Sequence, residues 1–157
     1  MTTALVTGAN RGIGLEFCRQ LRARGDSVIA VCRNASKELE ALDVQTIDNI
    51  DVTDVASMAT LANDLMGSQI DILICNAGIM LNESIGDMDF DSVREQFEVN
   101  ALGTLHTVTA HGFLRGDIAM MIGHVGLHVS GMQNGHADIA VFQIVTEADA
   151  GHVQCAL

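Results

Sequence analysis

The chain has 157 residues, of which 48% are apolar and 18% are charged, with 20 acidic against 8 basic side chains. This length predicts one domain with a buried core, and the composition argues against disorder. The net charge of −12 argues against nucleic acid or a membrane surface as a partner, since both need basic patches. No apolar run approaches the roughly 20 residues that span a bilayer, and the N-terminus carries no signal-like segment, so we expect a cytoplasmic protein.

Apolar runs and amphipathic segments alternate from the N-terminus. Residues 3–7 predict a buried strand that Gly8 closes. An amphipathic helix follows, with its apolar face repeating every four residues from Ile13, and Gly25 is expected to stop it. Residues 27–32 predict a second strand, because they are apolar and rich in β-branched side chains.

The middle of the chain continues the alternation. A short third strand is expected within 44–51, and residues 70–75 predict a fourth. Asp54 can cap the helix between them. The apolar face of this helix is predicted to hold Val55, Met58, Leu61, Ala62 and Leu65.

The last third begins with a clear pattern that then weakens. Residues 89–108 predict a long helix, and residues 117–122 a fifth strand. The inward face of the helix is predicted to hold Val93, Phe97, Ala101, Leu105 and Val108. Residues 123–135 show no clear period, whereas residues 138–145 resemble one more strand.

This order of elements predicts the fold class. Continuous apolar strands that alternate with helices are typical of a parallel sheet covered on both faces. We predict an α/β fold with a Rossmann-like, doubly wound parallel sheet of about five or six strands. The length predicts a single domain over residues 1–157.

A glycine-rich octet, residues 7–14, joins the first strand to the first helix. Its turn must be tight, and its backbone must come close to a ligand, which glycine allows. The helix N-terminus then offers unpaired N–H groups and partial positive charge to a phosphate. The predicted cofactor-binding residues here are Gly8, Asn10, Arg11, Gly12, Ile13 and Gly14.

The spacing Thr-Gly-x-x-x-Gly-Ile-Gly resembles the short-chain dehydrogenase/reductase family, closest to its carbonyl-reductase and C-factor-like members. Further motifs follow in the same order over residues 1–122, whereas residues 123–157 diverge. The resemblance therefore implies a single dinucleotide-binding domain over residues 1–157 that is shortened on its C-terminal side. The resemblance implies that Asp51 and Val52 contact adenine and that the segment Asn76, Ala77 and Gly78 lies near the nicotinamide. Residues 99–103 resemble the family's Val-Asn-x-x-Gly segment.

The choice between the two dinucleotides depends on the residues after the second strand. An acid there binds the ribose 2′-OH of NAD, whereas arginine accommodates the 2′-phosphate of NADP. Here Arg33 and Asn34 follow the strand, no acid occurs before Glu38, and Arg11 adds a second cation. Because two guanidinium groups suit a phosphate dianion, NADP(H) is favoured over NAD(H). A solvated helix face is the simpler reading of Arg19 and Arg22.

The resemblance implies a catalytic role for Asn100, holding a water of the proton relay; the alternative is a structural bond to backbone. The family's proton donor is a tyrosine paired with a lysine. This chain has no tyrosine, and Lys37 lies in another element. The predicted function is an NADP(H)-dependent oxidoreductase of a small carbonyl or alcohol substrate. The alternative is a catalytically inactive dinucleotide-binding protein, and in either case a homo-oligomer is possible.

The C-terminal histidines offer a weaker alternative. His124, His128 and His136 could supply an acid or bind a metal, and Ser130 could polarise a carbonyl. No carboxylate or cysteine completes a ligand set beside them, so no metal site is predicted.

Overall fold

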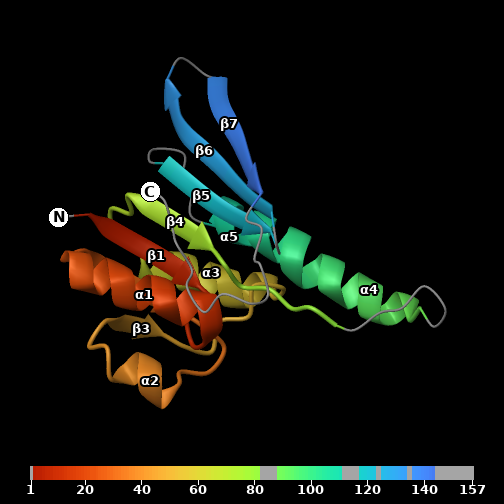
Figure 1. Cartoon of the computed structure of the whole chain (residues 1–157), viewed down its shortest axis with the longest axis horizontal. Helices are drawn as coiled ribbons and strands as arrows, with labels where there is room; N and C mark the ends of the chain where they lie inside the picture. The colour runs from red at the N-terminus through yellow and green to blue at the C-terminus, as the bar shows by residue number, and fades with distance from the viewer. Residues whose placement is uncertain (1, 82–87, 111–116, 123–124, 134–135, 144–157) are drawn as a thin grey trace.

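The computed structural model describes residues 2–81, 88–110, 117–122, 125–133 and 136–143 (Figure 1). A sheet with the strand order β3-β2-β1-β4-β5-β6-β7 forms its centre. Helices cover both faces of the part of the sheet that holds the first strands (Figure 1).

The first five strands are parallel. β1 lies between β2 and β4, and Leu5 of β1 pairs with Ile29 on one side and Leu73 on the other. The chain therefore winds outward from β1 in both directions, which confirms the predicted doubly wound, Rossmann-like sheet. The parallel strands are β1 (Thr3–Thr7), β2 (Ser27–Val31), β3 (Gln45–Ile47), β4 (Ile72–Cys75) and β5 (Asp117–Ile122).

Two further strands, β6 (Val125–Gln133) and β7 (His136–Gln143), extend the sheet beyond β5. Both pair antiparallel, β6 with β5 and β7 with β6 (Figure 1). The sequence predicts β7 but no element where β6 lies. Glycines at 126 and 131 interrupt the alternation by which a strand is recognised.

The two faces of the sheet bury separate cores because neighbouring residues of a strand point to opposite sides. On one face, Leu5 packs with Leu61 of α3, and the helix that contains Val108 covers the same core. On the other face, Val6 packs with Cys18 of α1. The helices are α1 (Gly12–Arg24), α2 (Lys37–Glu40), α3 (Val55–Asp64), α4 (Phe90–Phe97) and α5 (Gly103–Ala110).

Two predicted helix signals are confirmed. Gly25 ends α1 with a left-handed backbone, φ 94°. The carboxylate of Asp54 accepts hydrogen bonds from the backbone N–H groups of Ala56 and Ser57 at the start of α3. None of the helices in the described ranges is long and apolar enough to cross a membrane.

The long helix differs from its prediction, because a π-helical turn, η1 (Glu98–Leu102), separates α4 from α5. The wider turn shifts the register, so a repeat of four residues cannot stay on one face. Phe97 and Leu105 are 60% and 53% exposed, and Val93 is also exposed, which contradicts their predicted inward position. Val108 does pack on the core.

Small residues of α5 take the buried positions instead. Thr107 and Thr104 are buried, and their hydroxyls donate to the carbonyls of Gly103 and Asn100, one turn earlier. On α3, Met58 and Leu61 are buried as predicted, whereas Val55 is 67% exposed because it stands on the first, outward turn.

Candidate functional site

The glycine-rich loop lies where the carboxyl ends of β1, β2 and β4 meet. Gly8 and Gly12 adopt left-handed backbones with φ of 66° and 55°. The backbone N–H of Ala9 donates to the carbonyl of Val31, which ties the loop to β2. α1 begins at Gly12 with no side-chain cap from the described residues and no acid in its first turn, so its N–H groups can donate to an anion.

Gly8 and Gly14 are required by close packing. A Cβ on Gly14 would collide with the carbonyl oxygen of Gly8 and the amide nitrogen of Asn76. A Cβ on Gly8 would lie 2.8 Å from the Cα of Ala77. Gly12 differs, because no described atom lies within 4 Å of its Cβ position. The loop therefore packs tightly against the end of β4 and leaves an open approach at Gly12.

The segment after β4 is bonded to the loop. The side-chain amide of Asn76 donates to the carbonyl oxygens of Thr7 and Gly8, at 3.1 and 3.2 Å. The hydroxyl oxygen of Thr7, which is buried, accepts from the backbone N–H groups of Asn76 and Ala77, both at 3.1 Å. These bonds hold the loop after β1 and the segment after β4 at one edge of the sheet.

Asn100 lies in the π-helical turn and faces Ile79. Its amide oxygen accepts from the Ile79 N–H and its amide nitrogen donates to the Ile79 carbonyl, both at 2.8 Å. Gln96, one turn earlier, accepts from the N–H of Leu81. Two amides of the helix therefore hold the extended segment that follows Gly78. Of the two readings of Asn100, this geometry favours the bond to backbone.

The turn after β3 carries Asp51 and Val52. The Asp51 N–H donates to the hydroxyl of Ser57, and one carboxylate oxygen accepts from the N–H and hydroxyl of Thr53. These bonds from Thr53, together with the charge of Arg33, lower the pKa of the Asp51 carboxyl. Asp51 is therefore ionised at neutral pH and stands close to a predicted phosphate-binding arginine.

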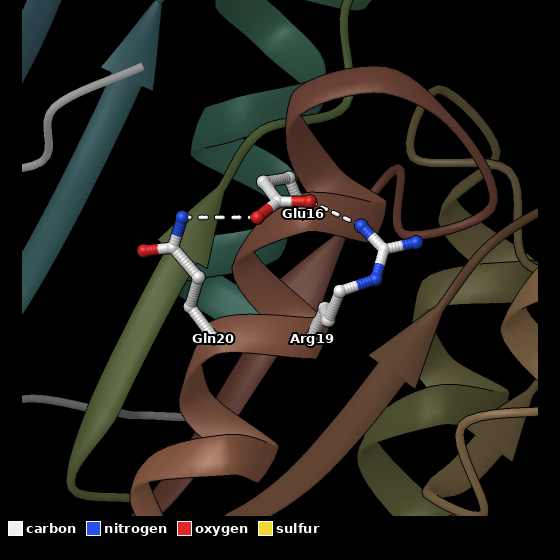
Figure 2. Close-up of polar contacts among 3 residues, drawn as sticks. All are labelled: Glu16, Arg19 and Gln20. Carbon is white, nitrogen blue, oxygen red and sulfur yellow. Dashed lines mark hydrogen bonds and ion pairs between the residues drawn. The ribbon is translucent and has the colours of Figure 1, made fainter. Parts of the chain in front are cut away.

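The arginines near the loop divide into two groups. Arg19 bonds Glu16, which also accepts from Gln20 at 3.0 Å (Figure 2). The hydrogen bond from Gln20 and then the contact with Arg19 lower the pKa of Glu16. Arg22 and Arg24 also have acidic partners, which supports the solvated helix face predicted for Arg19 and Arg22.

Arg11 and Arg33, the two predicted phosphate ligands, form no ion pair with any described residue. Both are exposed, as is Asn34, and both follow strands whose ends meet at the same edge of the sheet. These two guanidinium groups are therefore available to an external anion.

One cavity among the described residues lies away from this loop. A cavity of about 480 Å³ opens at the amino ends of the strands, next to Thr3, Ser27 and Gln45. The glycine-rich loop lies at the opposite, carboxyl ends. Ligands of open α/β sheets bind outside the carboxyl ends of the strands, so the volume of this cavity does not mark the site.

Sequence reasoning missed several residues that hold the site together. Ile79 acts through a contact 21 residues away, which a local pattern does not encode. Ser57 bonds residues six and eight positions earlier, but a serine at this spacing is no specific signal. His106 of α5 is half-buried, and its Nδ1 lies 3.0 Å from the carbonyl oxygen of Val52, but the sequence carries no signal for this contact. Among residues 2–81 and 88–110, no three metal-ligating side chains converge. His124 lies outside the described residues, as do the side chains of His128, Ser130 and His136.

Comparison with known proteins identifies the relatives of this chain. The sequence model of the short chain dehydrogenases matches residues 2–127. A 1-hydroxy-2-glutathionyl-2-methyl-3-butene dehydrogenase from Rhodococcus sp. (strain AD45) is 35% identical over 139 residues, which cover 83% of this chain and 62% of that protein.

Solved structures similar to this chain include dehydrogenases and reductases. A putative short-chain alcohol dehydrogenase from Burkholderia multivorans superposes with a TM-score of 0.70 and 28% identity, over 77% of this chain and 62% of its own. An NADPH-bound carbonyl reductase from chicken fatty liver gives a TM-score of 0.61 and 30% identity, over 70% and 50%. This chain thus spans less than two thirds of the length of these relatives.

Proposed function

The chain belongs to the short-chain dehydrogenase/reductase family, and from this we propose that it is an oxidoreductase that binds NADP(H) in preference to NAD(H). Its substrate is a small carbonyl compound or alcohol. The observation that carries the proposal is a pair of exposed arginines, Arg11 and Arg33, which form no ion pair with a described residue. They lie beside a glycine loop that leaves α1 open to phosphate. Bound NADP(H) supplies or accepts the hydride.

The pyrophosphate is assigned to residues 8–14. The tight packing of Gly8 and Gly14 holds the loop rigid, and the open space at Gly12 lets a ligand approach the backbone. Asn10 and Ile13 flank this approach. The unpaired N–H groups at the start of α1 are suited to the negative charge.

The 2′-phosphate is assigned to Arg11 and Arg33, with Asn34 as a neutral neighbour. A guanidinium group can bind phosphate with two parallel hydrogen bonds. Neither group forms an ion pair with an acid among the described residues, so phosphate binding breaks no ion pair there.

The adenine is assigned to Asp51 and Val52. The hydrogen bonds to the Asp51 carboxylate use Oδ1, which leaves Oδ2 as an acceptor. The N–H of the next residue, Val52, has no acceptor among the described residues. An acceptor beside a donor matches the amino group and N1 of adenine.

The nicotinamide is assigned to the segment Asn76, Ala77 and Gly78. Asn76 is committed to Thr7 and Gly8, which supports a positioning role. The amide of Asn100 is committed to Ile79, which likewise supports a positioning role rather than contact with the substrate.

The alternative is a dinucleotide-binding protein without turnover. The observation that favours it concerns Lys37, the only lysine of the chain. Lys37 begins α2, whose Leu39 packs in the same core as α1, whereas Asn100 belongs to the helix on the opposite face of the sheet. Lys37 therefore cannot tune an acid beside the nicotinamide.

The net charge of the chain bears on its partners and location. The value of −12 disfavours nucleic acid and a membrane surface as partners and suits a cytoplasmic protein. Three large apolar side chains are more than half exposed: Phe90 and Phe97 at the two ends of α4, and Leu105 on α5. Such apolar side chains support a homo-oligomer.

We expect NADPH to bind with a dissociation constant below about 100 µM, measured by the change in its fluorescence on titration with the protein. Absence of binding up to about 1 mM would contradict both the oxidoreductase and the inactive binder. A panel of small aldehydes and ketones then separates the two: oxidation of NADPH supports the enzyme, and constant absorbance supports the binder.

Arg33→Asp should reverse the cofactor preference. The substitution removes a phosphate ligand and places a carboxylate where it can bind the ribose 2′-OH of NAD and repel the 2′-phosphate. We expect the ratio of NADPH to NADH affinity to fall about 10–100-fold, measured by parallel titrations. Arg22→Asp is the matched control, since Arg22 lines the cavity at the amino ends of the strands. An unchanged ratio in Arg33→Asp would remove Arg33 from the phosphate site.

A further inference from the structure

His106 of α5 reaches across to the turn that follows β3. Its Nδ1 lies 3.0 Å from the carbonyl oxygen of Val52. A carbonyl oxygen can only accept a hydrogen bond, so Nδ1 must carry the proton. This contact joins residues 54 positions apart, from two elements that no local signal connects.

The side chain of Val52 packs against the same helix. Val52 is 7% exposed and belongs to the core that α3 and α5 share. A Cβ on Gly103, three residues before His106, would lie 2.6 Å from Cγ2 of Val52, so only glycine leaves room there. α5 therefore holds Val52 twice, its side chain at Gly103 and its carbonyl at His106.

The remaining peptides of the turn are also fixed. Ser57 accepts from the Asp51 N–H and donates to the carbonyl of Asn49, and Thr53 bonds the Asp51 carboxylate. The Val52 N–H lies between the bonded Asp51 N–H and the Val52 carbonyl bound by His106. Fixing the groups on both sides of this N–H fixes its direction.

We infer that His106 is a positioning residue for recognition of the adenine base. By holding the Val52 carbonyl, it keeps the Val52 N–H and Asp51 Oδ2 side by side as one donor and one acceptor. This inference rests on the proposed dinucleotide site, because it concerns the base that this site binds. It adds a specificity-determining role for a residue of α5, which does not itself touch the cofactor.

The test compares NADPH with its hypoxanthine analogue. Hypoxanthine replaces the amino group of adenine with a carbonyl oxygen and adds a proton to N1, so the donor and the acceptor exchange places. A fixed Val52 N–H and Asp51 carboxylate reject this pattern. We expect the wild-type protein to prefer NADPH about 10-fold in fluorescence titrations.

His106→Leu removes the bond to Val52. We expect NADPH to bind about 5-fold more weakly and the preference for adenine to fall to about 2-fold, since the turn can then rotate to suit either base. His106→Asn should retain the preference, because its amide nitrogen takes the place of Nδ1. His106→Gln, whose donor lies one methylene farther out, should lose it. The Asn and Gln variants decide the question if the Leu variant does not fold.

Thr109→Val is the control on α5, because its exposed hydroxyl bonds only carbonyls of its own helix, and it should keep the wild-type preference. Failure of the wild-type protein to bind NADPH would overturn the proposed function itself. Binding without a preference for adenine, or a preference unchanged in His106→Gln, would overturn the inference and leave the dinucleotide site standing.

Discussion

Gly14→Ala is expected to lower the free energy of unfolding by about 3 kcal/mol and to abolish NADPH binding, because overpacking usually costs about 1–3 kcal/mol or more. The added methyl would collide with the carbonyl oxygen of Gly8 and the side-chain nitrogen of Asn76. Neither is the free end of a flexible chain, since the first is backbone and the second is bonded to Thr7 and Gly8. The loop must therefore move away from α1, which destroys the proposed phosphate site.

Gly12→Ala is the matched control, since it adds the same methyl group two residues earlier. No described atom lies within 4 Å of its Cβ position, so its cost is only that of a left-handed alanine, about 1 kcal/mol. Urea unfolding monitored by circular dichroism, combined with NADPH titration, compares the two. Equal losses of stability in the two variants would show that packing at Gly14 is not the constraint.

Elements set by local chemistry could be predicted from the sequence. The expected strand over residues 3–7, the stop at Gly25 and the cap at Asp54 all agree with the structure. Each depends on residues within a few positions of one another: an apolar run, a left-handed glycine, and a carboxylate that accepts from N–H groups two and three residues later. The alternation of such elements was sufficient to predict the doubly wound sheet.

Features that depend on distant partners could not be predicted. The π-helical turn accompanies the pairing of Asn100 with Ile79, 21 residues away. Phe97 before this turn and Leu105 after it are exposed, although their spacing alone predicts burial. The family motifs indicate that Asn76 and Asn100 belong to the site. They do not reveal that both side-chain amides hydrogen-bond backbone groups, because those groups are distant in sequence. Strand β6 was missed because its pairing with β5 and β7, rather than a regular alternation of its own residues, defines it.

The second large effect concerns Asn76, which joins the two segments of the site. Asn76→Asp keeps the shape of the side chain but replaces the donor nitrogen with an oxygen that faces the carbonyls of Thr7 and Gly8. Two hydrogen bonds are lost and a negative charge meets two partial negative charges. We expect a loss of about 3–4 kcal/mol in the free energy of unfolding at pH 7. NADPH binding should weaken with it, because the carbonyl of Gly8 belongs to the phosphate loop.

The loss of stability in Asn76→Asp should depend on pH, because the new carboxyl group faces the carbonyls of Thr7 and Gly8. Two facing carbonyls disfavour the ionised carboxylate, so the pKa of the new carboxyl rises in the folded state above its unfolded value, about 3.9. The penalty is complete above the folded pKa and shrinks as the pH falls through it, because the protonated acid can donate one bond. Urea unfolding at pH 7 and pH 4.5 should show the difference from wild type shrinking by about 1–2 kcal/mol. Asn34→Asp, on an exposed residue at the same edge, should change stability by less than about 0.5 kcal/mol at either pH. A pH-independent loss in Asn76→Asp would contradict the facing of its amide nitrogen toward these two carbonyls.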